Sequence, residues 1–206
     1  MNRSLLIVGA GGHGRVIADI AEQLDRYETI AFLDDVEPTR AMNYWGKTSE
    51  ASQYAKECDF IVAIGNNATR SRLQEGLLMM GCVLATLVHP SASVSKQAIL
   101  GDGCVVMPGC VINTGAVIGK GGIVNTAATV DHDCQLGDYC HLSPGEHLCG
   151  TVKMGDLVWI GAGATVINNI SIVSHTMVGA GATVIKEITE PGTYAGVPAR
   201  RLGARP

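Results

Sequence analysis

Residues 94–130 read VSKQAILGDGCVVMPGCVINTGAVIGKGGIVNTAATV, and every sixth residue of this stretch is aliphatic. The period continues without a miss to residue 184, over sixteen positions. If about one residue in three is aliphatic, the chance probability of such a run is on the order of 10⁻⁸, which marks it as an internal repeat. The positions are Val94, Leu100, Val106, Ile112, Ile118, Val124, Val130, Leu136, Leu142, Leu148, Met154, Ile160, Val166, Ile172, Val178 and Val184.

A six-residue period fits neither an α-helix nor a flat strand, whose periods are 3.6 and 2 residues. It predicts a triangular parallel solenoid in which three hexapeptides form one coil and each aliphatic side chain points inward. The coils stack at the strand spacing of roughly 4.8 Å. The period does not determine the hand of the coil, because parallel crossovers are normally right-handed.

A second repeated position lies four residues after each aliphatic one and holds mostly small residues, which suit a tight interior corner. It comprises Ala98, Cys104, Cys110, Ala116, Gly122, Ala128, Cys134, Cys140, Ala164 and Ala182. Four of the seven cysteines are therefore predicted to be buried small hydrophobes rather than redox groups. Glycines follow the aliphatic residue at Gly101, Gly119, Gly137, Gly155, Gly161 and Gly179, as turns between the faces would require.

Glu146 occupies the small interior position of its hexad. A buried, unpaired carboxylate would cost on the order of several kcal/mol. We therefore expect Ser143-Pro144-Gly145 to shift the backbone so that Glu146 faces outward or meets a histidine, and a role in the active site is a further possibility.

Residues 1–88 follow a different pattern, in which short apolar runs alternate with helical periods. The expected strands are Ser4–Val8, Glu28–Leu33, Asp59–Ile64 and Val83–Leu87, and the expected helices lie near Val16–Leu24, Glu50–Glu57 and Thr69–Met80. This alternation predicts an α/β domain over residues 1–88, with a small parallel sheet covered by helices. The solenoid domain is expected over residues 89–206.

Gly9-x-Gly11-x-x-Gly14 follows the first expected strand and opens a helix, and Asp34 and Asp35 lie about 20 residues beyond it. This arrangement is typical of a Rossmann phosphate loop with an acidic ribose partner. A dinucleotide domain needs two mononucleotide halves, and there is room for one. We expect a half-Rossmann unit that holds a mononucleotide such as UDP rather than NAD; a tight strand–helix turn without a ligand is the alternative.

The net charge of −4 gives no electrostatic reason to expect nucleic acid as a partner. No run of about 18 apolar residues predicts a membrane span. The first apolar run is too short for the core of a signal peptide, so a cytoplasmic protein is expected. No Cys-x2-Cys pair is present, so a zinc site of the usual spacing is not expected.

Motifs from both halves of the chain occur together: GAGGHG at 9–14, FLDD at 32–35, AIGNN at 63–67, HPSA at 89–92, NTAATVDHDC at 125–134 and GVPAR at 196–200. In combination they resemble the hexapeptide-repeat sugar acetyltransferases, in particular the group of the bacillosamine-pathway UDP-amino-sugar N-acetyltransferase and the sialic acid O-acetyltransferases. The resemblance implies a left-handed parallel β-helix after the half-Rossmann domain, acetyl-CoA as acyl donor, a nucleotide-sugar substrate and a homotrimer.

By the same resemblance, the N-terminal domain holds the UDP-sugar. The implied contacts are Gly12, His13 and Gly14 for the diphosphate, Asp34 and Asp35 for ribose or uracil, and Ile64, Gly65 and Asn66 for the closing wall of the pocket. His13 could instead be a helix-start residue without a ligand contact.

Acyl transfer from a thioester needs a base for the proton of the nucleophile, and histidine suits this role because its reference pKa is about 6.5. His132 is the predicted base, because it should project outward and the similar enzymes place their base in this motif. Asp133 would orient the imidazole and stabilise its cation. Neighbours in an ideal strand point to opposite faces, so this pairing requires a corner or an irregular backbone.

The resemblance also implies a set of acetyl-CoA contacts. They are Asn125, His141, Gly150, Gly179, Gly181, Gly196, Val197, Pro198, Ala199 and Arg200. The family usually carries Asn and Lys where Val197 and Arg200 stand here, and a basic side chain there can meet CoA phosphates. No metal is expected, since Cys134 and Cys140 fall on the interior phase and leave too few convergent ligands for zinc.

The predicted activity is acetyl-CoA-dependent acetylation of the amino group of a UDP-linked amino-deoxy sugar, with a histidine base and no acyl-enzyme, as in polysaccharide biosynthesis. One alternative is O-acetylation of a sialic acid or a related sugar. Another is a trimeric scaffold that binds a nucleotide sugar without catalysis.

Overall fold

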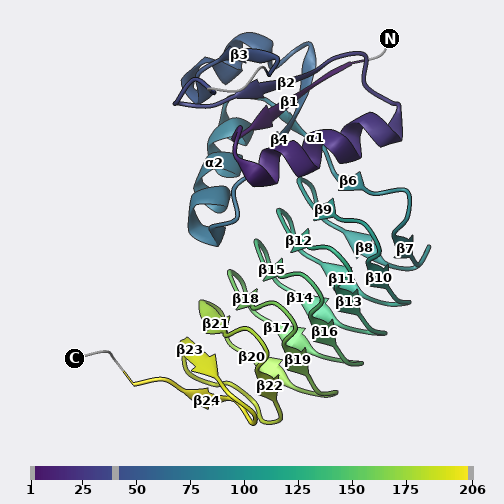
Figure 1. Cartoon of the computed structure of the whole chain (residues 1–206), viewed down its shortest axis with the longest axis vertical. Coiled ribbons are helices and arrows are strands. Elements are labelled where there is room, and N and C mark those ends of the chain that lie inside the picture. The colour runs from purple at the N-terminus through teal and green to yellow at the C-terminus, as the bar shows by residue number, and fades with distance from the viewer. Residues whose placement is uncertain (1–2, 39–41, 204–206) are drawn as a thin grey trace. The chain divides into compact units, whose positions relative to one another are not determined.

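The computed structural model describes residues 3–38 and 42–203, and it divides into two compact units after Pro90. The first unit is built from parallel strands and helices, and the second is a solenoid of stacked coils (Figure 1).

The strands of the first unit are β1 (Ser4–Val8), β2 (Ile30–Leu33), β3 (Tyr44–Gly46), β4 (Cys58–Val62), β5 (Val83–Leu84) and β6 (Leu87–Val88). Its helices are α1 (Gly12–Leu24), the 3-10 helix η1 (Thr48–Tyr54) and α2 (Asn67–Met79). Five strands pair in parallel in the order β3-β2-β1-β4-β5. The chain leaves β1 toward β2 on one side and later returns to β4 on the other. Ligands of open α/β sheets bind at the carboxyl ends of the strands at such a switch point.

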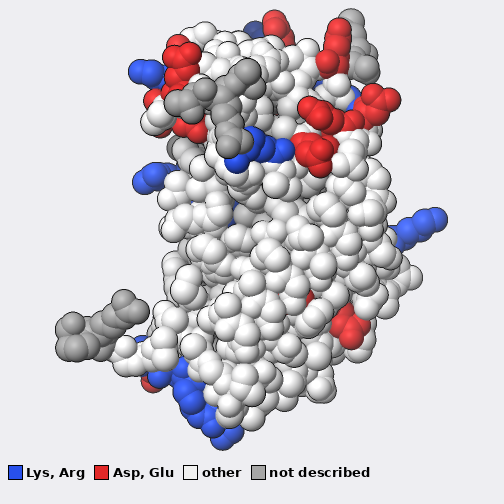
Figure 2. All heavy atoms as spheres, viewed as in Figure 1, with Lys and Arg blue, Asp and Glu red and all other residues white. Residues whose placement is uncertain are grey.

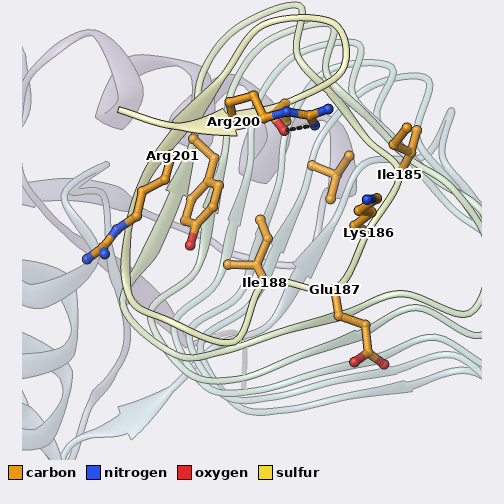
Figure 3. A pocket seen from close by; sticks show the side chains of 9 residues that line it. Ile185, Lys186, Glu187, Ile188, Arg200 and Arg201 are labelled. Carbon is orange, nitrogen blue, oxygen red and sulfur yellow. Dashed lines mark hydrogen bonds between the residues drawn. The ribbon is translucent and has the colours of Figure 1, made fainter. Parts of the chain in front are cut away.

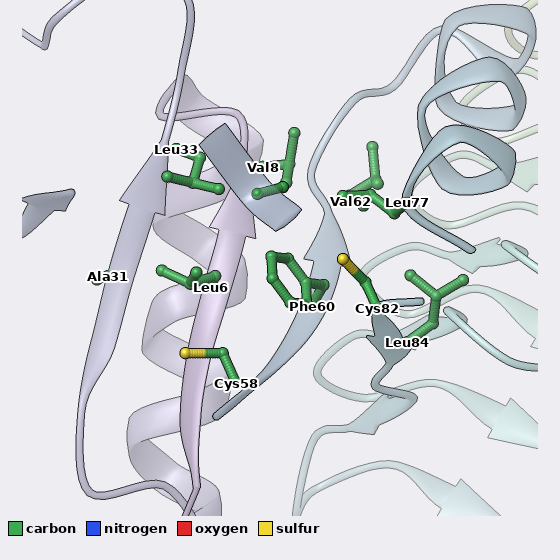
Figure 4. Packing of buried hydrophobic residues seen from close by; sticks show 11 residues of the cluster. Leu6, Val8, Ala31, Leu33, Cys58, Phe60, Val62, Leu77, Cys82 and Leu84 are labelled. Atoms are coloured by element: carbon green, nitrogen blue, oxygen red, sulfur yellow. The ribbon is translucent and has the colours of Figure 1, made fainter. Parts of the chain in front are cut away.

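The sheet has a continuous apolar core in which Leu6, Phe60 and Val62 pack from neighbouring strands (Figure 4). The predicted strands correspond to β1, β2, β4 and β5, but the short edge strand β3 was not predicted. The helix expected near 50–57 is the 3-10 helix η1, which begins earlier. Its start is held by the Glu50 carboxylate, which accepts a hydrogen bond from the Lys47 amide.

The solenoid has three sheets, one for each side of its triangular coil, and their strands pair in parallel except for the last two strands of the chain, which are antiparallel. The first comprises β7 (Ser93–Val94), β10 (Val111–Ile112), β13 (Thr129–Val130), β16 (His147–Leu148), β19 (Thr165–Val166) and β22 (Thr183–Val184). The second comprises β8 (Ile99–Leu100), β11 (Val117–Ile118), β14 (Gln135–Leu136), β17 (Lys153–Met154) and β20 (Ser171–Ile172). The third includes β9 (Val105–Val106), β12 (Ile123–Val124), β15 (His141–Leu142), β18 (Trp159–Ile160), β21 (Thr176–Val178), β23 (Gly192–Ala195) and β24 (Arg200–Arg201).

Up to β22 the strands of successive coils pair eighteen residues apart, as in Ile112 with Val130, whereas β21 pairs with β23 sixteen residues further along the chain. The six-residue ladder therefore places three inward aliphatic side chains in every coil, and its members from Val106 to Val184 are buried. Each such burial contributes about 1.5–3 kcal/mol. The predicted fold class, a half-Rossmann α/β domain followed by the parallel β-helix of hexapeptide repeats, is confirmed.

The four corner cysteines fill the interior as predicted. All are buried with free thiols, and each sulfur donates to a backbone carbonyl fifteen residues further along the chain, as Cys104 Sγ does to Gly119 O at 3.1 Å. Burial raises the pKa of the Cys110 and Cys134 thiols to about 11. Both therefore stay protonated at neutral pH.

The explanation predicted for the glycines after each aliphatic residue is wrong. Gly101, Gly119 and Gly161 have ordinary φ angles, so turn conformation does not require glycine there. A Cβ at Gly101 or Gly161 would instead lie 2.5 Å from a backbone nitrogen of the adjacent coil. Close stacking of the coils excludes side chains at these positions.

The expectation that Glu146 faces outward is also wrong. Its side chain is fully buried in the solenoid, at the interior corner that Ala128 and Ala164 occupy in the coils on either side. Neither carboxylate oxygen has a hydrogen-bond partner among the described residues. The small alanines leave the space, and burial raises the pKa of Glu146 well above 4.5, so the group is buried as the neutral acid.

Candidate functional site

The glycine-rich loop joins the carboxyl end of β1 to the start of α1. Gly9 has a φ of +111°, and a Cβ at Gly14 would collide with the Gly9 carbonyl oxygen, so helix and strand pack too closely for any other residue at position 14. Gly11 caps α1 without a side-chain hydrogen bond. The first amides of the helix and its dipole are therefore available to an anion such as a diphosphate.

The two aspartates after β2 are tied to the backbone around this loop. Asp34 accepts hydrogen bonds from the amides of Ala10 at 2.7 Å and Val36 at 3.0 Å. Asp35 accepts from the Thr48 amide at 3.2 Å. Asp34 thus fixes the glycine-rich loop, a positioning role that the sequence pattern did not predict, and each carboxylate retains lone pairs for further donors.

His13 lies in the first turn of α1, and its Nε2 is buried without a hydrogen-bond partner among the described residues. Burial, and then the nearby charge of Arg70, lower the pKa of His13 to about 4. The imidazole is therefore neutral at physiological pH. It can donate or accept a hydrogen bond at a phosphate, but it brings no positive charge.

Arg70 fixes the loop between β4 and α2, and this role was not predicted from the sequence. It is fully buried in α2 and donates to the carbonyls of Ile64 at 3.0 Å and Gly65 at 3.1 Å, and to the Asn67 side chain at 2.9 Å. Asn66 caps α2 by accepting from the Thr69 amide at 2.9 Å. The only sequence signal was an arginine one turn into an otherwise ordinary helix, which is too weak to identify a buried cation.

His132 and Asp133 form the pair that was predicted. His132 Nδ1 lies 2.9 Å from Asp133 Oδ2 at the corner between β13 and β14, and the His132 side chain is 53% exposed. Asp133 has a φ of +59°, and this left-handed turn lets neighbouring side chains meet, as the pairing requires. The hydrogen bond to Asp133 raises the pKa of His132 above 6.5. Nε2 remains as the atom that can take a proton from a nucleophile.

Asp131 fixes the backbone before this pair. Its Oδ1 accepts from the His132 amide at 2.7 Å and from the Asn113 side chain of the preceding coil at 2.8 Å. These two hydrogen bonds lower the pKa of Asp131. A polar groove of about 360 Å³ begins at Asp133 and runs over Thr151 and Lys153 of the next coil.

Asn125 and His141, which were predicted separately, lie together. Asn125 Nδ2 is 3.3 Å from His141 Nε2, and the imidazole stacks on Trp159 with ring centroids 4.8 Å apart. Trp159 in turn donates to Ser143 Oγ at 2.9 Å. His141 belongs to β15 in the third sheet, so within one chain it lies on a different side of the solenoid from the corner that carries His132.

The C-terminal segment folds back on the last coil. The Thr183 amide donates to Gly196 O at 3.1 Å, and the Ala199 amide donates to Thr183 O at 2.8 Å. The Val197–Pro198 peptide is cis, and Val197 is exposed. Beside it is a pocket of about 260 Å³ where Arg200 extends toward Lys186 (Figure 3).

The predicted glycine contacts differ in their surroundings. A Cβ at Gly181 would meet open space, whereas at Gly179 it would lie 3.1 Å from the Ala195 side chain. Gly150 lies against the His132 ring. Within residues 3–38 and 42–203 no cluster of three or more His, Cys, Asp or Glu side chains could hold a metal ion, and no helix is long and apolar enough to cross a membrane.

Residues 4–77 match the family described as the PglD N-terminal domain. GDP-perosamine N-acetyltransferase of Escherichia coli O157:H7 is 32% identical over 163 residues, which cover 75% of this chain and 73% of that protein. The chain belongs to this family of nucleotide-sugar N-acetyltransferases. UDP-N-acetylbacillosamine N-acetyltransferase of Bacillus subtilis (strain 168) is 40% identical over 111 residues, about half of each protein.

Solved structures of this acetyltransferase family match almost the whole chain. The acetyltransferase domain of PglB from Neisseria gonorrhoeae FA1090, also solved with acetyl coenzyme A, has a TM-score of 0.94 and 41% identity, covering 98% of this chain and 100% of that one. PerB from Caulobacter crescentus, in complex with CoA and GDP-perosamine, has a TM-score of 0.92 and 35% identity, with 97% of each chain covered. The names of these relatives thus refer to both GDP-linked and UDP-linked amino sugars.

Proposed function

We propose that this protein transfers the acetyl group of acetyl-CoA to the amino group of a nucleotide-linked amino-deoxy sugar. The observation that carries this proposal is the His132–Asp133 pair at 2.9 Å, with its second imidazole nitrogen free for chemistry, on a chain from this family. The open N-terminus of α1 at the switch point of the sheet supports a nucleotide diphosphate in the first unit.

In the proposed reaction the sugar amine attacks the thioester carbonyl while His132 Nε2 accepts its proton. Asp133 stabilises the imidazolium that forms. The carbon–sulfur bond then breaks, and the CoA sulfur leaves with the proton held by His132. The acetyl group passes directly to the amine, so no acyl-enzyme forms. UDP remains the expected nucleotide of the substrate, and GDP is the alternative that the assay below tests.

The acyl donor is proposed to contact the Asn125–His141 pair near its thioester and the 196–200 segment near its nucleotide. The exposed Lys186 and Arg200 beside the C-terminal pocket supply positive charge that suits the CoA phosphates. Gly181 leaves open space for the pantetheine arm.

A homotrimer is proposed because the candidate groups are divided between two sides of one solenoid. A neighbouring copy would bring its Asn125 and His141 to the His132 of the first. The face of the solenoid visible in Figure 2 is largely free of charged side chains, which favours burial against another subunit. Seven free thiols suit the reducing cytoplasm, where we expect the protein to act.

The test is release of free CoA from acetyl-CoA with a panel of UDP-amino-sugars, a GDP-amino-sugar and sialic acid. We expect turnover with a nucleotide amino sugar, and a loss of at least about a hundredfold in His132→Ala. Turnover with sialic acid alone would favour O-acetylation. No release of CoA with any sugar would favour a binding scaffold without catalysis. A fully active His132→Ala variant would exclude His132 as the base.

A further inference from the structure

Two glycines flank the His132–Asp133 pair, one in the coil on each side. A Cβ built on Gly150 would lie 2.5 Å from His132 Nε2 and 2.7 Å from Cε1. A Cβ built on Gly115 would fall well inside 3.0 Å of Asp133 Oδ1. The imidazole therefore lies over the bare backbone of one coil, and the carboxylate over that of the other.

The backbone itself does not require glycine at either position. Gly115 has a φ of +72°, but the same corner of the following coils holds Asp133, Thr151 and Asn169 at φ angles of 59° to 62°. Gly150 has an ordinary φ, and the equivalent positions two coils earlier and one coil later are Thr114 and Asn168. Side chains are thus accommodated at these two corner positions in other coils, and Thr114 and Thr151 carry side chains in the same coils as Gly115 and Gly150.

We infer that Gly115 and Gly150 are positioning residues, whose lack of a side chain leaves the space in which His132 and Asp133 pair. Any Cβ at position 150 would push the imidazole sideways, because the ring can rotate but the stacked coil cannot move. A Cβ at position 115 would displace the carboxylate in the same way. This inference rests on the proposed role of His132, and it gives Gly150 a task distinct from contact with the acyl donor.

The experiment compares Gly150→Ala and Gly115→Ala with the matched control Gly163→Ala. Gly163 has a φ of +64° and open space around its Cβ position, so this substitution carries the strain of a left-handed alanine without a collision. The first readout is the pKa of the His132 imidazole, followed by NMR of labelled histidine and assigned by difference from His132→Ala. We expect it to fall in both test variants, because the Asp133 hydrogen bond is weakened, and to stay unchanged in Gly163→Ala.

The second readout is steady-state kinetics. We expect kcat to fall about tenfold or more in both test variants, within the range that general-base catalysis contributes, with little change in KM for acetyl-CoA. In an Asp133→Gly background, where the side chain that would collide is gone, Gly115→Ala should have almost no further effect on either readout.

A wild-type histidine pKa in both test variants would overturn the inference. So would a Gly150→Ala defect confined to KM for acetyl-CoA, which would identify Gly150 as a donor contact. If the histidine pKa falls but turnover does not, the positioning role stands and His132 is not the base. If Gly115→Ala fails to fold while Gly163→Ala folds, restoration of the fold by adding Asp133→Gly supports the collision, and failure to restore it contradicts the collision.

Discussion

His132 is half-exposed, and its orientation comes from hydrogen bonds on both sides of the residue. Asp133 pairs with Nδ1, while Asp131 Oδ1 accepts from the His132 amide and is itself held by the Asn113 side chain of the preceding coil. The imidazole is therefore held in one orientation while about half of its side chain stays exposed. This combination suits a base that must reach a substrate held by other parts of the protein.

Because the base must be unprotonated to accept a proton, activity should rise with pH through the pKa of His132. The hydrogen bond that the imidazole donates to Asp133 is the main cause that raises this pKa. Asp133→Asn should therefore move the acid limb of the kcat/KM profile to lower pH and reduce the plateau by about tenfold or more, because the imidazolium loses its partner. A pH–rate profile checks this; an unchanged acid limb would mean that another group titrates.

Glu146 predicts an unusual dependence of stability on pH. Burial raises the pKa of Glu146 in the folded state above the 4.5 of an unburied glutamate. The contribution of the protonated side chain to the free energy of unfolding is therefore complete below pH 4.5 and is lost as pH rises toward the folded pKa. The near-isosteric Glu146→Gln cannot ionise. The difference in melting temperature, variant minus wild type, should therefore grow by several degrees between pH 5 and 8, as followed by circular dichroism at about 5, 6.5 and 8. A constant difference across this range would show that Glu146 does not titrate inside the fold.

At the level of elements, the solenoid was predictable because its sequence repeats with its structure. One inward position in six fixes the face of every strand, and the corner cysteines follow from the same phase. The orientation of Glu146 was mispredicted because Ala128 and Ala164, in the coils on either side, leave room for its side chain. That room depends on the stacking of the coils and is not evident from the local sequence. Five of the six glycines, all except Gly179, were misread because their constraint comes from the adjacent coil, eighteen or nineteen residues further along the chain.

The site was predictable where neighbours in sequence carry it and less so where distant residues meet. His132 and Asp133 are adjacent, and the family motif marks them. Asn113 anchors Asp131 from the preceding coil, and Arg70 fixes the Ile64 and Gly65 carbonyls by folding back over the start of its own helix; neither contact follows from a sequence motif. Asn125 and His141 were predicted individually, but their contact comes from the stacking of β12 on β15.

The packing of the solenoid also predicts which thiols react. Six cysteines are buried, while Cys149 is only partly buried. A thiol reagent at neutral pH should therefore modify no more than Cys149 in the native protein and all seven residues in urea. Mass mapping identifies the modified site. Rapid labelling of Cys110 or Cys134 in the folded protein would contradict the interior placement of the corner cysteines.

For the whole molecule, the proposed trimer predicts complementation between inactive variants. Homotrimers of His132→Ala and of His141→Ala should both be severely impaired. Mixed trimers from co-expression should recover activity, because some interfaces then combine an intact His132 from one subunit with an intact His141 from another. The measurement is the activity of doubly tag-purified mixtures, with the mass checked against three times 21.5 kDa. Mixtures no more active than the separate variants would place both histidines in a site within one subunit.

The most direct test of the central proposal is the chemical bond made in the product. The wild-type protein is incubated with acetyl-CoA and a UDP- or GDP-linked amino-deoxy sugar, and the sugar is analysed by mass spectrometry before and after mild base. We predict a single acetyl group that survives the base, as an amide does, and that is absent from the His132→Ala reaction. An acetyl group removed by mild base would reveal an ester and contradict N-acetylation.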